Sequence, residues 1–145
     1  MTVKTLTFGE LGAAWLIAAA AAFVIDFGIA SLAAWLTKAP ATFAPFTLLP
    51  VFAGCFGGAL MACLAYLALQ TFLKGDFRLV YLIVISIALI ASYHLPWRLT
   101  YSASPRFMGV TLPMQLALGL MHTVVVSLSA IALFAFSHQG LSQGE

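Results

Sequence analysis

The chain has 145 residues, of which 63% are hydrophobic and only 7% are charged, and its mean hydropathy is +1.10. Soluble domains carry about a quarter charged residues, so this composition excludes an ordinary soluble domain and indicates an integral membrane protein. The formal net charge is only +2, and the cationic residues form no cluster, which excludes binding to a nucleic-acid backbone. The length suits a single domain covering residues 1–145.

Four apolar segments are long enough to cross a bilayer. A transmembrane helix needs about 20 predominantly apolar residues to span roughly 30 Å of hydrocarbon. Segments of that size lie at residues 11–36, 50–73, 77–95 and 112–136. A proline lies near one boundary of each segment, where a helix tolerates the missing N–H or stops: Pro40, Pro50, Pro96 and Pro113. The sequence therefore predicts an all-α fold, an antiparallel four-helix transmembrane bundle.

Four spans place both chain ends on the same side of the membrane, and the Lys and Arg residues of the flanking segments should identify that side. These six residues divide three to three, with Lys4, Lys74 and Arg78 on the terminal side and Lys38, Arg98 and Arg106 opposite. Lys74 and Arg78 lie in a very short turn, whereas the other loops are longer. This density favours cytoplasmic termini in a multi-pass membrane protein.

Asp26 is the only acidic residue inside a predicted span. An ionisable side chain at the centre of a bilayer costs about 2.5–3.5 kcal/mol even on the lenient insertion scale, so it needs a partner or a function. The positions above and below it at helical spacing are all alanines: Ala19, Ala22, Ala30 and Ala33. Because small residues mark a face that packs closely on another helix, we expect Asp26 to point into the bundle.

His122 lies near the middle of the last span, with Gln115 and Ser129 seven residues to either side. Counted from the span ends, its depth in the membrane is close to that of Asp26. We therefore predict an intramembrane polar site of Asp26, His122, Gln115 and Ser129, centred on a hydrogen bond or ion pair between Asp26 and His122. Such a pair could fix the register of the helices, bind a ligand or carry protons. Whether the two side chains touch, and whether they are charged, stays open.

His94 lies at the end of the third span, close to Trp97 and Arg98. Aromatic and cationic side chains favour the headgroup level, so we expect these three residues to form an interfacial anchor. The alternative is a metal or haem bound jointly by His94 and His122. Helical rise separates those two residues by about 12 Å in depth, whereas zinc ligands lie about 2.0–2.2 Å from the ion. We predict no metal site and no cofactor.

Gly54, Gly58 and Ala62 follow one another at four-residue spacing in the second span. This small-xxx-small pattern is typical of a face on which transmembrane helices pack closely, either within the bundle or between two copies of the chain. Cys55 and Cys63 lie eight residues apart on the same helix. That separation is about 12 Å by helical rise and exceeds the reach of a disulfide.

Signatures of catalysis are missing from the sequence. It contains no Gly-x-Ser-x-Gly elbow, no glycine-rich phosphate loop and no pair of carboxylates within one segment. We therefore predict no catalytic residue and favour a protein that is not an enzyme. A membrane enzyme or cofactor carrier is a further hypothesis.

Several short segments together resemble an uncharacterised family of small bacterial four-span membrane proteins, a domain-of-unknown-function group frequent in actinobacteria. They are Val24-Ile25-Asp26, the segment 54–58, Ser92-Tyr93-His94-Leu95-Pro96 and Leu118-Gly119-Leu120-Met121-His122. The resemblance covers nearly the whole chain, although the family usually carries Asn where this chain has Asp26. It implies a four-span fold in a bacterial inner membrane and brings no assigned activity.

The sequence thus favours a non-enzymatic binding or accessory unit of the lipid bilayer, alone, as a homo-oligomer or within a larger membrane complex. The alternative is a proton-linked small-molecule transporter or channel that uses Asp26 and His122. These two classes differ in whether a solute crosses the membrane, which the sequence does not decide.

Overall fold

A computed structural model describes residues 5–41, 43–73, 75–101, 104–107 and 109–139. Every regular element in these ranges is a helix. Four helical stretches are long and apolar enough to span a membrane, in agreement with the predicted all-helical fold. Lys4 and Lys74, on which the orientation argument depends, lie outside the described residues.

The helices match the predicted spans closely. Five α-helices and three short 3-10 helices follow one another in the order α1 Phe8–Thr37, η1 Ala44–Phe46, α2 Leu48–Phe72, α3 Arg78–Ser92, α4 His94–Arg98, η2 Leu99–Tyr101, η3 Pro105–Phe107 and α5 Leu112–Gln139. The third stretch differs from the expectation, because Pro96 does not end it. After Ser92 the chain turns at Tyr93 and continues as α4 to Arg98. Pro96 lies in the first turn of α4, where its missing N–H has no acceptor within the helix in any case.

Helix α1 begins with a capping box formed by Thr7 and Glu10. Thr7 accepts a hydrogen bond from the Glu10 backbone N–H, at 3.3 Å, and the Glu10 side chain accepts one from the Thr7 N–H, at 2.8 Å. This reciprocal capping box satisfies N–H groups that would otherwise be unpaired at the helix start. The helix ends at Lys38, whose φ of 51° places it in the left-handed region.

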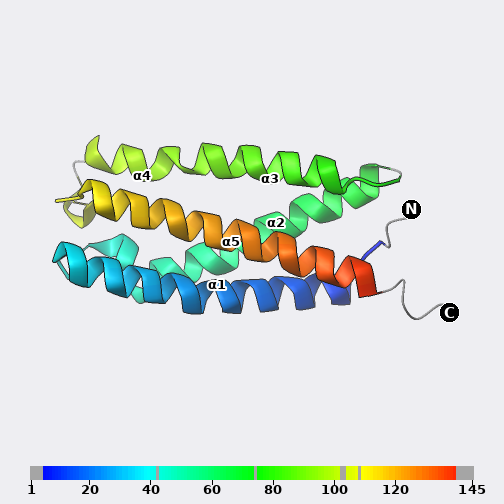
Figure 1. Ribbon diagram of the computed structural model, residues 1–145, viewed down its shortest axis with the longest axis horizontal. Coiled ribbons are helices and arrows are strands. Elements are labelled where there is room, and N and C mark those ends of the chain that lie inside the picture. Colours follow the sequence, from blue (N-terminus) through cyan, green and yellow to red (C-terminus); the bar gives the residue numbers. More distant parts are fainter. Residues whose placement is uncertain (1–4, 42, 74, 102–103, 108, 140–145) are drawn as a thin grey trace.

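The two ends of the bundle differ. Figure 1 shows that α1 begins and α5 ends at one end, together with the turn from α2 to α3, and we call this the terminal end. The 3-10 helices lie at the opposite end, which we call the loop end. Each long helix thus starts at the end where the preceding one stops.

Small side chains hold α1 at the centre of the packing. The alanines that flank Asp26 at helical spacing are buried, as are Ala14 and Ala18. Helix α1 packs most extensively on α5 and α2, whereas α3 contacts α2 and α5 only thinly. Close approach of backbones through small residues is the usual way in which helices associate where no hydrophobic effect drives them together.

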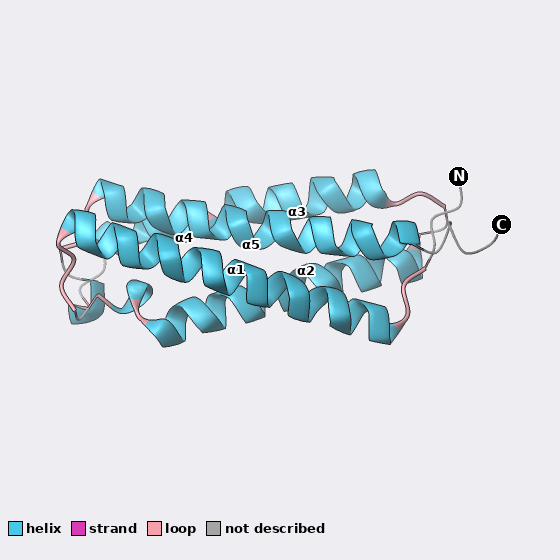
Figure 2. Cartoon of the chain, turned by 60° about the horizontal axis from the view of Figure 1, so that its bottom comes forward, coloured by secondary structure: helices cyan, strands magenta, loops and turns pink. Residues whose placement is uncertain are grey.

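Helix α2 crosses the bundle obliquely. Figure 2 shows α2 and α1 crossing toward the middle of the bundle, and Figure 1 shows α2 approaching α3 at the terminal end. Gly58 lies where α2 meets α5, since a Cβ atom at this position would lie 2.9 Å from Cγ1 of Val125. A residue larger than glycine would therefore push the two helices apart or displace Val125.

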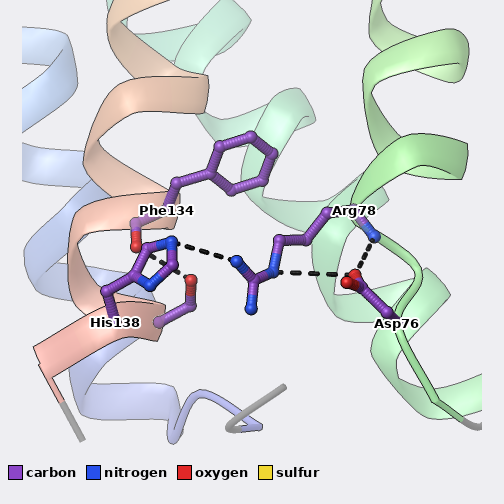
Figure 3. Close-up of polar contacts among 5 residues, drawn as sticks. Asp76, Arg78, Phe134 and His138 are labelled. Atoms are coloured by element: carbon purple, nitrogen blue, oxygen red, sulfur yellow. Dashed lines mark hydrogen bonds and ion pairs between the residues drawn. The ribbon is translucent and has the colours of Figure 1, made fainter. Parts of the chain in front are cut away.

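Polar contacts tie the elements together at the terminal end. Arg78 at the start of α3 places Nη1 3.0 Å from Nε2 of His138 near the end of α5, and its Nε lies 3.6 Å from Oδ1 of Asp76 (Figure 3). Gln70 on α2 donates to the Leu6 carbonyl and accepts from the Leu6 N–H, both at 3.1 Å. The chain before α1 is thereby fixed to the end of α2.

The outer surface of the bundle is strongly apolar. Large hydrophobic side chains are exposed along all four long helices, among them Val24, Leu49, Phe72, Ile87 and Ile131. Soluble monomers rarely expose contiguous apolar patches larger than a few hundred Å². The surface therefore agrees with the composition in pointing to an apolar surrounding.

Candidate ligand-binding cavity

A cavity of about 710 Å³ lies between α2, α3 and α5. Helix α2 lines it mainly with small residues, which include Gly54, Gly58, Ala62 and Ala65. Helices α3 and α5 contribute mostly aliphatic side chains, such as Ile85, Leu89, Leu118 and Val125. The small side chains on α2 leave the space that larger residues would occupy.

The cavity exists because α2 and α3 diverge. At the terminal end an aromatic cluster holds these helices together: the ring centroids of Tyr66 and Tyr81 lie 5.3 Å apart, and those of Tyr66 and Phe77 lie 5.0 Å apart. The cavity-lining residues of both helices lie on the loop side of this cluster, from Pro50 to Ala65 on α2 and from Val84 to Ser92 on α3. The cavity therefore fills the wedge between the two helices.

Asp26 of α1 belongs to the lining of the cavity and is 1% exposed. The Cys55 thiol on α2 donates a hydrogen bond to Oδ2 of Asp26, at 3.3 Å. The other carboxyl oxygen, Oδ1, is buried and has no hydrogen-bond partner among the described residues. Asp26 thus points into the bundle, as expected, and keeps one oxygen unsatisfied.

His122 of α5 lines the same cavity. It also lines a second, adjoining hollow of about 400 Å³, which reaches Arg98 and Leu99 near the loop end. No hydrogen bond or ion pair between Asp26 and His122 occurs in the described part of the chain. The direct bond that the matched depths suggested is therefore not formed here, although both side chains border one cavity.

Gln115 and Ser129 are buried, but the structure does not place them in the cavity wall. The Gln115 side-chain amide donates to the Pro96 carbonyl, at 3.1 Å, and so fastens α4 to α5. The Ser129 hydroxyl donates to the Val125 carbonyl one turn earlier, at 2.7 Å. The three polar residues of α5 therefore have different surroundings, and of the three only His122 lines the cavity.

The three residues expected at the membrane interface lie together in the structure. His94, Trp97 and Arg98 all belong to α4 at the loop end, and all three are exposed. Arg98 lines the second hollow beside His122, but His94 does not. Within the described residues, no group of three or more His, Cys, Asp or Glu side chains is arranged to hold a metal ion.

The small-residue face of α2 has two roles in the structure. Gly58 meets α5 closely, as the contact with Val125 shows, whereas a Cβ at Gly54 would have no atom within 4 Å. Gly54, Gly58 and Ala62 all line the cavity. The pattern that predicted helix packing therefore produces one close crossing and, on either side of it, open space.

Sequence reasoning missed the contacts that join the α3–α4 turn to α5. The Tyr93 hydroxyl and the Thr123 hydroxyl share a hydrogen bond, and a Cβ at Gly119 would lie 3.0 Å from Cε1 of Tyr93. The Asp26–Cys55 contact was also missed. Tyr93 and Gly119 belong to two of the segments that carry the family resemblance, Ser92–Pro96 and Leu118–His122. Nothing in the sequence, however, indicates which residues on different helices contact one another.

No family model, curated protein or solved structure matches the chain significantly. The resemblance to a bacterial four-span family therefore stays a prediction.

We predict that Asp26 is coupled to Cys55 and not to His122. In a double-mutant cycle, Asp26→Ala and Cys55→Ala should together cost less unfolding free energy than the sum of their separate costs, by on the order of 1 kcal/mol, because either change removes the same hydrogen bond. Asp26→Ala and His122→Ala should add within about 0.5 kcal/mol. Unfolding in lipid bicelles by steric trapping measures both cycles. Coupling to His122 with none to Cys55 would contradict the observed contact.

Proposed function

We propose that the chain is a four-pass membrane protein that binds a small, mostly apolar molecule in the cavity between α2, α3 and α5. One observation carries the proposal: a cavity of about 710 Å³ with apolar walls and a buried carboxyl group. Ligand pockets are typically about 300–1,000 Å³, lined mainly by hydrophobic side chains with a few polar groups. The function we propose is binding and not catalysis.

Membrane insertion is supported by the helices and by the surface they expose. The four stretches are 21–30 residues long, which covers the hydrocarbon thickness with some tilt, and their outward side chains are apolar. We place the bundle in a bacterial inner membrane as antiparallel helices with cytoplasmic termini. The positive charge of Arg78, which begins α3 directly after the short α2–α3 turn, supports this orientation.

The position of the cavity supports access from the lipid. Met61 on α2 lines the cavity and is 67% exposed, and Val84 on α3 lines it and is also exposed on the outer surface. The cavity thus reaches the outer surface between α2 and α3, at a level inside the spans. A ligand dissolved in the hydrocarbon can enter there without crossing water.

A cavity-filling variant tests this proposal. Gly54→Leu should weaken binding at least about tenfold, the effect of losing roughly 1.4 kcal/mol, because the new side chain enters open space in the cavity. The measurement is equilibrium binding of tritiated 1-methoxyadamantane, a compact apolar molecule, to purified protein in lipid nanodiscs, with empty nanodiscs subtracted. Wild-type protein should bind one molecule per chain, saturably.

Gly57→Leu is the matched control. A Cβ at Gly57 also meets no atom within 4 Å, but Gly57 does not line the cavity, so the same added side chain should leave binding unchanged. Equal loss of binding in both variants, or no saturable binding by the wild type, would rule out this cavity as the binding site.

A second candidate function is proton-linked transport. The observation that favours it is that Asp26 and His122 border one cavity, and that a second hollow leads from His122 to Arg98 near the loop end. Intramembrane acidic and histidine side chains often mark proton pathways. If the protein is a proton-linked transporter, Asp26→Asn should abolish a pH-driven flux of solute or protons in liposomes that contain the purified protein. A flux that persists in the variant, or is absent from the wild type, removes this candidate.

A further inference from the structure

We propose that the ligand of this cavity is a lipophilic amine, whose ammonium group binds the Asp26 carboxylate while its apolar body fills the wedge between α2 and α3. This inference rests on the proposed binding function and specifies the chemistry of the ligand. It joins the apolar lining of the cavity to the carboxyl group of Asp26, a lining residue with one unsatisfied oxygen.

The Asp26 carboxyl group is built to accept hydrogen bonds. The Cys55 thiol already donates to Oδ2, at 3.3 Å, while Oδ1 is buried without a partner among the described residues. A buried polar atom that makes no hydrogen bond costs about 1–3 kcal/mol, and more when it is charged. A ligand that brings an N–H donor to Oδ1 removes this cost.

Charge adds a second requirement. An isolated carboxylate in an apolar interior is strongly disfavoured unless a positive charge accompanies it. The described part of the chain places no Lys or Arg in an ion pair with Asp26. An ammonium group supplies both the positive charge and up to three N–H donors, whereas an alcohol or ether supplies no charge and an anion is repelled.

No other polar group of the cavity wall donates a hydrogen bond to Oδ1 of Asp26. Arg106 also lines the cavity, but it belongs to η3 at the loop end and is exposed. The Ser92 hydroxyl donates to the Leu89 carbonyl of its own helix, at 2.7 Å. His122 borders the cavity without a hydrogen bond to Asp26. The remaining lining is apolar, which suits the body of an amphiphile and offers no competing site for its amine.

Two molecules with the same apolar cage test the inference. In nanodiscs of neutral lipid, wild-type protein should bind tritiated 1-aminoadamantane at least about tenfold more tightly than 1-methoxyadamantane, as expected for a charge-assisted hydrogen bond in a buried site. Asp26→Asn removes the charge and keeps the shape. In this variant the preference for the amine over the ether should fall to about twofold or less.

Asp76→Asn serves as the matched control, because it removes a carboxylate by the same change but Asp76 is exposed before α3 and does not line the cavity, so this variant should keep the preference for the amine. A photoreactive diazirine derivative of the amine gives a second readout on unmodified protein, which covers the case in which Asp26→Asn fails to fold. Its label should appear on the α1 segment around Asp26 or on the segments of α2 and α3 that line the cavity.

The outcomes separate the two proposals. If the wild type binds both molecules equally, the cavity binds apolar molecules but the amine inference is wrong. If the label appears only outside the segments that line the cavity, the amine binds elsewhere and the inference is wrong as well. If the preference survives in Asp26→Asn, another group recognises the amine and the inference is again wrong. If neither molecule binds the wild type saturably, the binding function itself fails.

Discussion

The close crossing of α2 with α1 and α5 is the constraint on which the rest of the structure depends. Alanines bury one side of α1, and Gly58 brings α2 so near to α5 that a Cβ there would lie 2.9 Å from Val125. At the terminal end the Tyr66–Tyr81 contact holds α2 to α3. With α2 fixed at both places and inclined across the bundle, α3 cannot stay beside it at the loop end. The cavity is the consequence of this geometry.

Asp26 gives that cavity its chemical character. An acidic side chain inside a bilayer is expensive, and a purely structural role would be served by a carboxyl group whose two oxygens both have partners. Here one oxygen receives the Cys55 thiol and the other has no partner in the described chain. Asp26 belongs to the lining of the cavity, so the cost of burying its unsatisfied oxygen is offset when a ligand brings a donor to it. This is the physical reason to connect Asp26 with binding and not only with helix register.

The sequence predicted the long helices well because the length of an apolar segment is a local signal, although Pro96 did not end the third stretch as expected. It also predicted that Asp26 points inward, since the alanines around it lie on one helix face. It could not predict that Cys55 is the partner of Asp26, that Gln115 reaches the Pro96 carbonyl, or that Gly54 borders open space. Each of these depends on the rotation and crossing angle of two helices, which residue spacing within one helix does not determine. Matched depth suggested an Asp26–His122 bond, but equal depth does not make two side chains point at one another.

A disulfide between α2 and α5 tests the central geometry most directly. Built on the backbone, a Cβ at Gly58 lies 3.9 Å from the Cβ of Val125, within the range of about 3.5–4.5 Å found in disulfides. In a Cys55→Ala, Cys63→Ala background, Gly58→Cys with Val125→Cys should therefore cross-link on mild oxidation in native membranes, as mass spectrometry of the linked peptides would show. The pair Gly57→Cys with Val125→Cys should remain reduced, because Gly57 does not face α5. Cross-linking of the Gly57 pair in place of the Gly58 pair would contradict the crossing of α2 and α5, and with it the cavity.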